Sequence, residues 1–133
     1  MPLDTADIEL IEAAQAVMVA HHRPHWHTVA AALRDEHGRI WTGLHLGATV
    51  GRLQICAEPV ALGRALLEGA GRIVASVAVR HPKPGEENQE IAVVSPCGAC
   101  RELLADYAPD AWVIVPGARK LPLSALLPLP YQR

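Results

Sequence analysis

The three cysteines constrain this chain more than any other residue type. They are Cys56, Cys97 and Cys100, and each lies at the predicted start of a helix. An odd number of cysteines argues against a disulfide framework and favours thiol or metal chemistry. Exposed N–H groups and the helix dipole lower the pKa of a thiol at a helix start and favour the thiolate. The fold is therefore expected to bring two helix starts together at one site.

Length and composition predict one domain over residues 1–133. Half of the residues are hydrophobic and 20% are charged, which is typical of a globular protein. The net charge of −2 offers no basic surface for a phosphate backbone, so we expect no nucleic-acid partner. No apolar run approaches the roughly 20 residues that span a bilayer, and the acidic N-terminus lacks the features of a signal peptide. We expect a cytoplasmic protein without membrane contact.

The order of the predicted elements indicates an α/β fold. The hydrophobic spacing and turn residues predict helices over 5–19, 56–67, 95–107 and 121–127, and strands over 29–34, 40–46, 72–80, 91–94 and 111–115. Helices alternate with strands after residue 56, which predicts a mixed or parallel sheet covered by helices in a three-layer αβα sandwich. The chain has no Phe and only five Trp and Tyr residues, so the core must consist of Ala, Val, Leu and Ile.

The three thiols suit zinc, which binds sulfur ligands tetrahedrally. Cys97 and Cys100 lie three residues apart, so both sulfurs can point the same way. A structural zinc ion has four protein ligands, whereas a catalytic ion keeps one position for a water whose pKa it lowers. Glu58 follows Cys56 by two residues and is placed to take a proton from such a water and pass it on. General acid–base catalysis of this kind contributes about 10²–10⁴-fold in rate.

Two other interpretations of the cysteines stay open from the residues alone. The spacing of Cys97 and Cys100 also permits a redox-active disulfide. A histidine as fourth ligand, either His45 or a member of the 21–27 cluster, would instead make a structural zinc site in a non-catalytic module.

A CAE motif followed later by PCGAC resembles the cytidine deaminase family, in particular its small homotetrameric branch. The resemblance covers most of the chain. It implies Cys56, Cys97 and Cys100 as zinc ligands and Glu58 as the proton shuttle in a hydrolysis that releases ammonia from a cytosine ring, as in pyrimidine salvage. It also implies a mixed five-stranded sheet with helices on both faces, and a homotetramer (or homodimer) whose chains complete the active site.

The same resemblance implies a set of contacts with a small-molecule substrate. The main chain around Ala57 and Ser95 would hold the ring. His27 aligns with a Phe that lines the base pocket in the family, and its imidazole can stack on a ring. Tyr131 would cap the pocket of a neighbouring subunit, as terminal aromatic residues do in this family.

This chain departs from the family at positions that concern the substrate. His45 and Gly47 align with an Asn and a Glu that hold the ribose hydroxyls, and the lost carboxylate removes a charged hydrogen bond of about 1.5–3 kcal/mol. The SPCG segment and the terminal LLPxxY pattern are also similar to the blasticidin-S deaminases, which act on a cytosine nucleoside antibiotic and lack this Glu as well. We expect cytidine or deoxycytidine as the substrate, or else a modified cytosine nucleoside or another aminated heteroaromatic.

A further departure lies directly after the CAE motif. Pro59 stands where many members of the small branch have an Arg that offsets the charge of three thiolates. The two helix dipoles, Arg101 or Arg52 are the candidates for this compensation.

Overall fold

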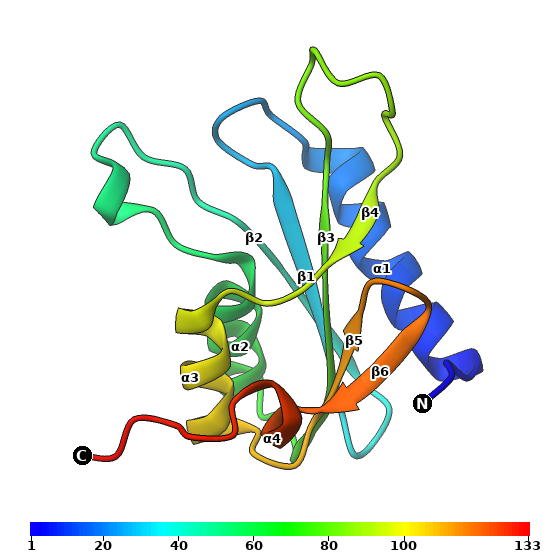
Figure 1. Cartoon of the computed structure of the whole chain (residues 1–133), viewed down its shortest axis with the longest axis vertical. Helices are drawn as coiled ribbons and strands as arrows, with labels where there is room; N and C mark the ends of the chain where they lie inside the picture. The colour runs from blue at the N-terminus through cyan, green and yellow to red at the C-terminus, as the bar shows by residue number, and fades with distance from the viewer.

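A mixed sheet of six strands separates two layers of helices in the computed structural model, which describes all residues 1–133 (Figure 1). The helices are α1 (Thr5–His21), α2 (Ala57–Leu67), α3 (Gly98–Tyr107), α4 (Leu123–Leu126) and the short 3₁₀ helix η1 (Gly51–Leu53). The strands are β1 (Val29–Asp35), β2 (Ile40–Leu44), β3 (Ile73–Arg80), β4 (Ala92–Val94), β5 (Trp112–Val115) and β6 (Arg119–Pro122). None of the helices is long and apolar enough to cross a lipid bilayer.

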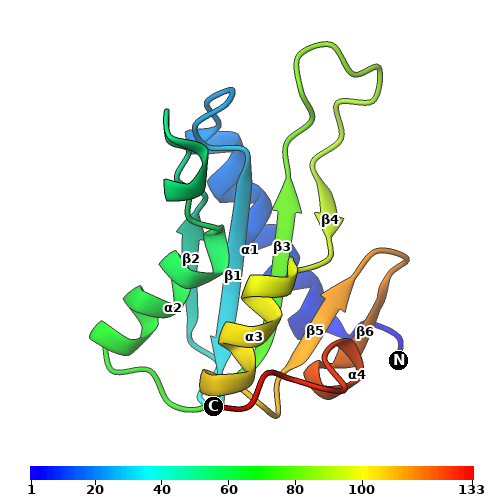
Figure 2. The same cartoon turned by 60° about the vertical axis from the view of Figure 1, so that its left-hand side comes forward.

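One edge of the central strand β3 pairs with two different strands. The main order is β2-β1-β3-β5-β6, in which only β3 and β5 run parallel. The short β4 pairs with residues 78–80 of β3, while β5 pairs with residues 75 and 76. The two strands therefore follow one another along the same edge, and the chain leaves β4 between them to begin α3 (Figure 2).

The β1 and β3 strands are buried on both faces because helices cover both. Helix α1 packs against one face, where a cluster of apolar side chains includes Leu10, Met18, Ala32 and Val77. The opposite face carries α2 and α3, and alternate residues of the same strands, such as Leu33 and Ile73, belong to that second cluster. This arrangement confirms the three-layer αβα sandwich expected from the sequence.

Small residues bring α2 into backbone contact with β2. Ala57, Ala61 and Ala65 recur at every fourth position, and all three are fully buried. They face Gly43 of β2, where an added Cβ would lie 2.3 Å from the amide nitrogen of Ala61 and 2.5 Å from the carbonyl oxygen of Ala57. Ala61 therefore belongs to the core and not to the outer face of this helix. The contact fixes where α2 begins, and with it the position of Cys56.

The sheet has one strand more than the five expected. Residues 119–122, Arg-Lys-Leu-Pro, form the edge strand β6 instead of a turn, and the following helix begins only at Leu123. Two cations and a proline are typical of an edge strand, but they conceal the strand pattern in the sequence. Lys120 is buried and lies 2.8 Å from the carboxylate of Asp7 in α1, a long-range ion pair that local patterns do not reveal.

Replacing Gly43 by Ala is expected to destabilise the fold and displace α2. The added methyl group would overlap the main chain of α2, and overpacking of this kind costs about 1–3 kcal/mol. Urea unfolding and zinc content of the purified protein measure the two effects. Gly63→Ala is the matched control, since this helical glycine has no neighbour within 4 Å of an added Cβ and alanine favours a helix by about 0.5–1 kcal/mol. Equal stability of the Gly43→Ala protein and the wild type would contradict the close contact.

Candidate active site

The starts of α2 and α3 bring the three cysteine sulfurs together. Cys56 is the N-cap of α2, Cys97 is the N-cap of α3, and Cys100 lies one turn further along α3. Their Sγ atoms all lie within 4.8 Å of one another, and those of Cys56 and Cys97 are 3.5 Å apart. Four ligands placed tetrahedrally at a Zn–S distance of about 2.3 Å lie about 3.8 Å from one another. The three thiols therefore fit a zinc ion in number, type and spacing.

The local environment distinguishes the three thiols. Burial disfavours the Cys97 thiolate, but N–H groups at the start of α3 outweigh this and lower the pKa of Cys97, whose Sγ accepts a hydrogen bond from the Cys100 N–H at 3.4 Å. Burial raises the pKa of Cys56 and, together with the nearby Glu58 carboxylate, that of Cys100. All three are free thiols. A zinc ion bound here supplies Lewis acidity that makes a coordinated water more acidic.

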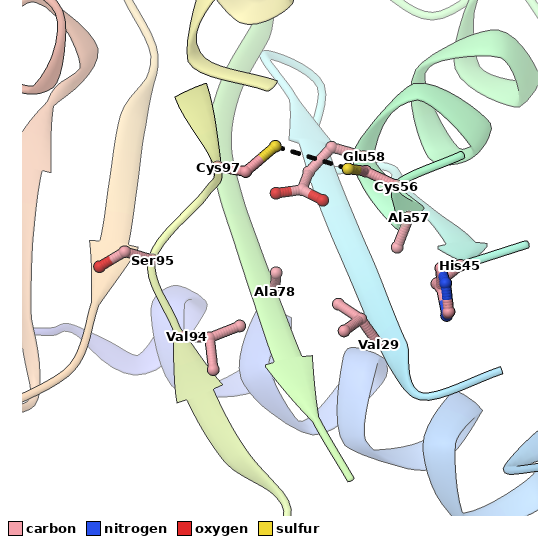
Figure 3. Close-up of a pocket in the computed structure, with 9 residues that line it drawn as sticks. All are labelled: Val29, His45, Cys56, Ala57, Glu58, Ala78, Val94, Ser95 and Cys97. Atoms are coloured by element: carbon pink, nitrogen blue, oxygen red, sulfur yellow. Dashed lines mark hydrogen bonds between the residues drawn. The ribbon is translucent and has the colours of Figure 1, made fainter. Parts of the chain in front are cut away.

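Glu58 is the acidic group of this site. It lies in the first turn of α2 and is only 4% exposed. Figure 3 shows its carboxylate directed into the pocket beside the sulfurs of Cys56 and Cys97. Burial raises the pKa of Glu58 above the ordinary range of a carboxyl group, which favours its protonated form and suits it to hold a proton.

Cys56, Cys97 and Glu58 line a cavity of about 140 Å³. Its other walls are mainly apolar and come from strand and helix residues: Val29, Ala57, Ala78 and Val94, with His45 and Ser95 (Figure 3). Apolar walls with a few polar groups are typical of a site that orients a small, flat ligand. The sequence does not single out Val29, Ala78 and Val94, because they carry no chemical motif and differ from other strand residues only in where the fold places them.

Hydrogen bonds hold the His45 ring in one orientation. Its Nδ1 accepts a hydrogen bond from the Thr28 N–H at 3.2 Å, so the ring proton lies on Nε2, which donates to Oε1 of Gln54 at 3.0 Å. His27 lies next to it but does not line the cavity, because its Nδ1–H donates to the carbonyl oxygen of His45 at 2.9 Å. Val29 lines the cavity, whereas His27 braces the chain around His45. The contact of His27 with a substrate ring stays a prediction.

The remaining predicted contacts lie in different places. Ala57 and Ser95 both line the cavity, and Figure 3 shows the Ser95 hydroxyl turned away from Glu58. Tyr131 is 80% exposed, and its N–H donates to the carboxylate of Glu102 on α3 at 3.1 Å. In the single chain, Tyr131 is therefore not part of the cavity.

Gly47 has no room for a side chain. Its N–H donates to the carbonyl oxygen of Trp26 at 2.7 Å, and an added Cβ would lie 2.3 Å from the carbonyl oxygen of His25. Any side chain at position 47 would therefore overlap the main chain at residues 25 and 26. The absence of a carboxylate at this position is built into the loop packing.

Of the groups proposed to offset the thiolate charge, Arg101 is held next to the cysteine segment. Its Nε donates to the carbonyl oxygen of Pro96 at 2.9 Å, and its Nη1 to that of Leu126 at 3.1 Å. Arg52 lies in the exposed helix η1, and Pro59 lies in the first turn of α2, where a missing N–H costs little. The charge compensation itself stays a prediction.

Comparison with known proteins agrees with this geometry. A family model for the cytidine and deoxycytidylate deaminase zinc-binding region matches residues 4–115. A blasticidin-S deaminase from Bacillus cereus is 42% identical over 130 residues, which cover 96% of this chain and 93% of that protein. A cytidine deaminase from Halalkalibacterium halodurans is 33% identical over 101 residues, 76% of this chain and 68% of that protein.

Solved structures show the same fold. A cytidine deaminase from Mycobacterium leprae superposes with a TM-score of 0.77 at 27% identity, over 95% of this chain and 100% of that one. One from Mycobacterium tuberculosis superposes with a TM-score of 0.81 at 25% identity, over 98% of this chain and 100% of that one.

Fold, thiol cluster and buried carboxyl define a zinc-dependent hydrolytic deaminase that acts on a small molecule. The chain belongs to the cytidine and deoxycytidylate deaminase family. Membership makes it an enzyme, so the open alternative of a non-catalytic zinc module is wrong.

Replacing Glu58 by Gln is expected to abolish turnover without removing zinc. The amide keeps the size of the side chain but cannot carry the proton, so kcat should fall by about 10²–10⁴-fold. Ammonia release and metal analysis measure the two properties. Glu68→Gln at the exposed end of the same helix is the matched control and should keep full activity.

Replacing Cys100 by Ser provides the converse result. The buried thiol ligand is lost, so zinc content and turnover should fall together. Full turnover in the Glu58→Gln protein, or full zinc content in the Cys100→Ser protein, would contradict the assignment of these residues.

Proposed function

We propose that residues 1–133 form one domain that deaminates a cytosine nucleoside, releasing ammonia and leaving the uracil nucleoside. The proposal rests on one observation, the buried Glu58 carboxyl beside three clustered thiols, two of which line the same mainly apolar cavity as Glu58. Glu58 takes a proton from the attacking water and delivers it to the ring nitrogen. A second transfer through the same carboxyl protonates the departing amine, so water and substrate yield the carbonyl product and ammonia.

The contacts proposed for the ring come from the cavity walls. Cys56, Cys97 and Cys100 are the proposed zinc ligands, and the main chain at Ala57 and Ser95 holds the ring edge. Val29 and Ala78 supply the apolar faces against which a flat ring can pack. His45 lies where the sugar would leave the cavity, and its Nδ1 and Nε2 are already engaged within the protein.

A modified nucleoside of the blasticidin S type is the second candidate substrate. The packing of Gly47 against the chain at His25 leaves no carboxylate to hold ribose hydroxyls, so recognition of an ordinary ribose loses a contact of about 1.5–3 kcal/mol. The 42% identity to a blasticidin-S deaminase supports the same candidate.

A substrate panel distinguishes the two candidates. We expect ammonia release from at least one cytosine nucleoside among cytidine, deoxycytidine and blasticidin S, and less from free cytosine, which lacks the sugar. Turnover of blasticidin S at a kcat/KM at least tenfold above that of cytidine would support the second candidate, because the missing carboxylate corresponds to a factor of about ten or more. The Glu58→Gln protein is the negative control. No release from any nucleoside would overturn the proposal.

Further proposals concern the oligomeric state, the location and the metabolic role of the enzyme. We propose a homotetramer, or else a homodimer, in which Tyr131 reaches the cavity of a neighbouring chain. We also propose that the enzyme is cytoplasmic and that it serves pyrimidine salvage if cytidine is its substrate. Leu66 and Leu67 at the end of α2 are 55% and 89% exposed, and apolar surface of this kind supports association.

Replacing Leu67 by Glu is expected to weaken this association and lower activity together, because a charge is placed in an apolar contact. Analytical ultracentrifugation over a dilution series, with parallel assays, measures both. Val19→Glu changes an apolar residue of α1 that is 76% exposed and lies on the opposite side of the sheet, and it serves as the control. A fully active monomer would refute the shared active site.

A further inference from the structure

Cys97 is the thiol of the site that packing holds least. Its residue is exposed, whereas Cys56 is partly buried and Cys100 is buried. The segment that joins β4 to α3 consists of Ser95, Pro96 and Cys97, and of these three only Pro96 is buried. Metal ligands are normally held in place by outer hydrogen-bond partners. A zinc ligand on this exposed segment therefore needs a contact that the core does not supply.

Arg101 makes that contact from one turn inside α3. Helical side chains lean towards the N-terminus of their helix, so Arg101 reaches back over the first turn. Its Nε donates to the carbonyl oxygen of Pro96 at 2.9 Å, and its main-chain N–H donates to that of Cys97 at 3.0 Å. The Pro96 carbonyl precedes the N-cap and lies outside the hydrogen-bond ladder of the helix. The two bonds hold the main chain on either side of the Cys97 Cα.

The other end of the guanidinium is anchored to the core through α4, which lies beside α3 (Figure 2). Nη1 of Arg101 donates at 3.1 Å to the carbonyl oxygen of Leu126, the last residue of α4. Helix α4 is itself fixed, because Leu123 is buried in the core and its N–H donates to the carbonyl oxygen of Ala111 at 2.9 Å. One guanidinium thus ties the Cys97 segment to a helix whose position the core sets.

We propose that Arg101 is a positioning residue that holds the Cys97 sulfur for zinc, and that it acts through its two side-chain hydrogen bonds and not through its charge. A planar guanidinium presents Nε and Nη1 in fixed directions, whereas a lysine ammonium is a single nitrogen on a flexible stem. Lysine would supply the same charge but not the same bridge. This role rests on the proposed function, because it requires Cys97 to be a zinc ligand.

Arg101→Lys and Arg101→Gln separate the two roles. Both variants lose the bridge between Pro96 and Leu126, so both should bind zinc about 10- to 100-fold more weakly, the loss that is typical when an outer partner of a metal ligand is removed. Competition with a chelator of known affinity, starting from the zinc-loaded protein, measures this. Wild-type affinity in Arg101→Lys with a loss only in Arg101→Gln would overturn the proposal in favour of charge compensation. Wild-type affinity in both variants would overturn it as well.

Arg64→Gln is the matched control. Nη1 of Arg64 also donates to a main-chain carbonyl oxygen, that of Thr42 at 3.1 Å, but Thr42 belongs to the edge strand β2 and does not line the cavity with the thiols. This variant should keep the wild-type zinc affinity. Cobalt(II) bound in place of zinc reports ligand geometry through its visible bands, which should shift in both Arg101 variants. A lower urea midpoint with unchanged bands would show a role in stability alone and overturn the proposal.

The role of Arg101 and the proposed function can fail separately. No ammonia release from any nucleoside would overturn the function, while zinc affinity still tests Arg101. If the wild type binds no zinc, the proposed ligands are wrong, and hydrogen exchange of the proteins as purified then tests whether Arg101 holds this segment. The amides of residues 97–101 should exchange about 2- to 10-fold faster in Arg101→Lys, the factor that corresponds to one hydrogen bond, but not in Arg64→Gln. Equal exchange in the wild type and Arg101→Lys would overturn the positioning role.

Discussion

The active site depends on the backbone contact between α2 and β2. Gly43 has no side chain, and Ala57 and Ala61 have small ones, so the helix lies directly on the strand. This contact fixes where α2 begins relative to the sheet, and therefore where Cys56 and Glu58 lie. A larger side chain at any of these positions would lift the helix and separate its thiol from those of α3. The chain has no phenylalanine and its core is rich in alanine, and both features allow the helices to pack close to the sheet.

The second half of the site depends on the division of one sheet edge between β4 and β5. Because β4 pairs only with the last residues of β3, the chain leaves the sheet early and enters α3 above its middle. The start of α3 thereby meets the start of α2, which brings the sulfurs together. N–H groups in the first turn of α3 lower the pKa of Cys97.

The segments proposed to surround the sugar are loops outside the sheet. The segment around His25 packs against Gly47, and His22 stacks on His81 in the wall of a second cavity that His45 also lines. The thiols and Glu58 thus belong to a different part of the fold from the residues proposed to contact the sugar. Such a division lets the substrate change while the thiols and Glu58 stay as they are.

The sequence by itself determined the chemistry, because Cys56, Glu58, Cys97 and Cys100 are identified by residue type, spacing and position at helix starts. It also determined the layers, since strand and helix periods are local properties. Only the tertiary structure decided that Lys120 lies in a sixth strand, that Val29 rather than His27 lines the cavity, and that His45 joins two cavities. Each of these depends on contacts between residues far apart in the chain, which no local pattern records.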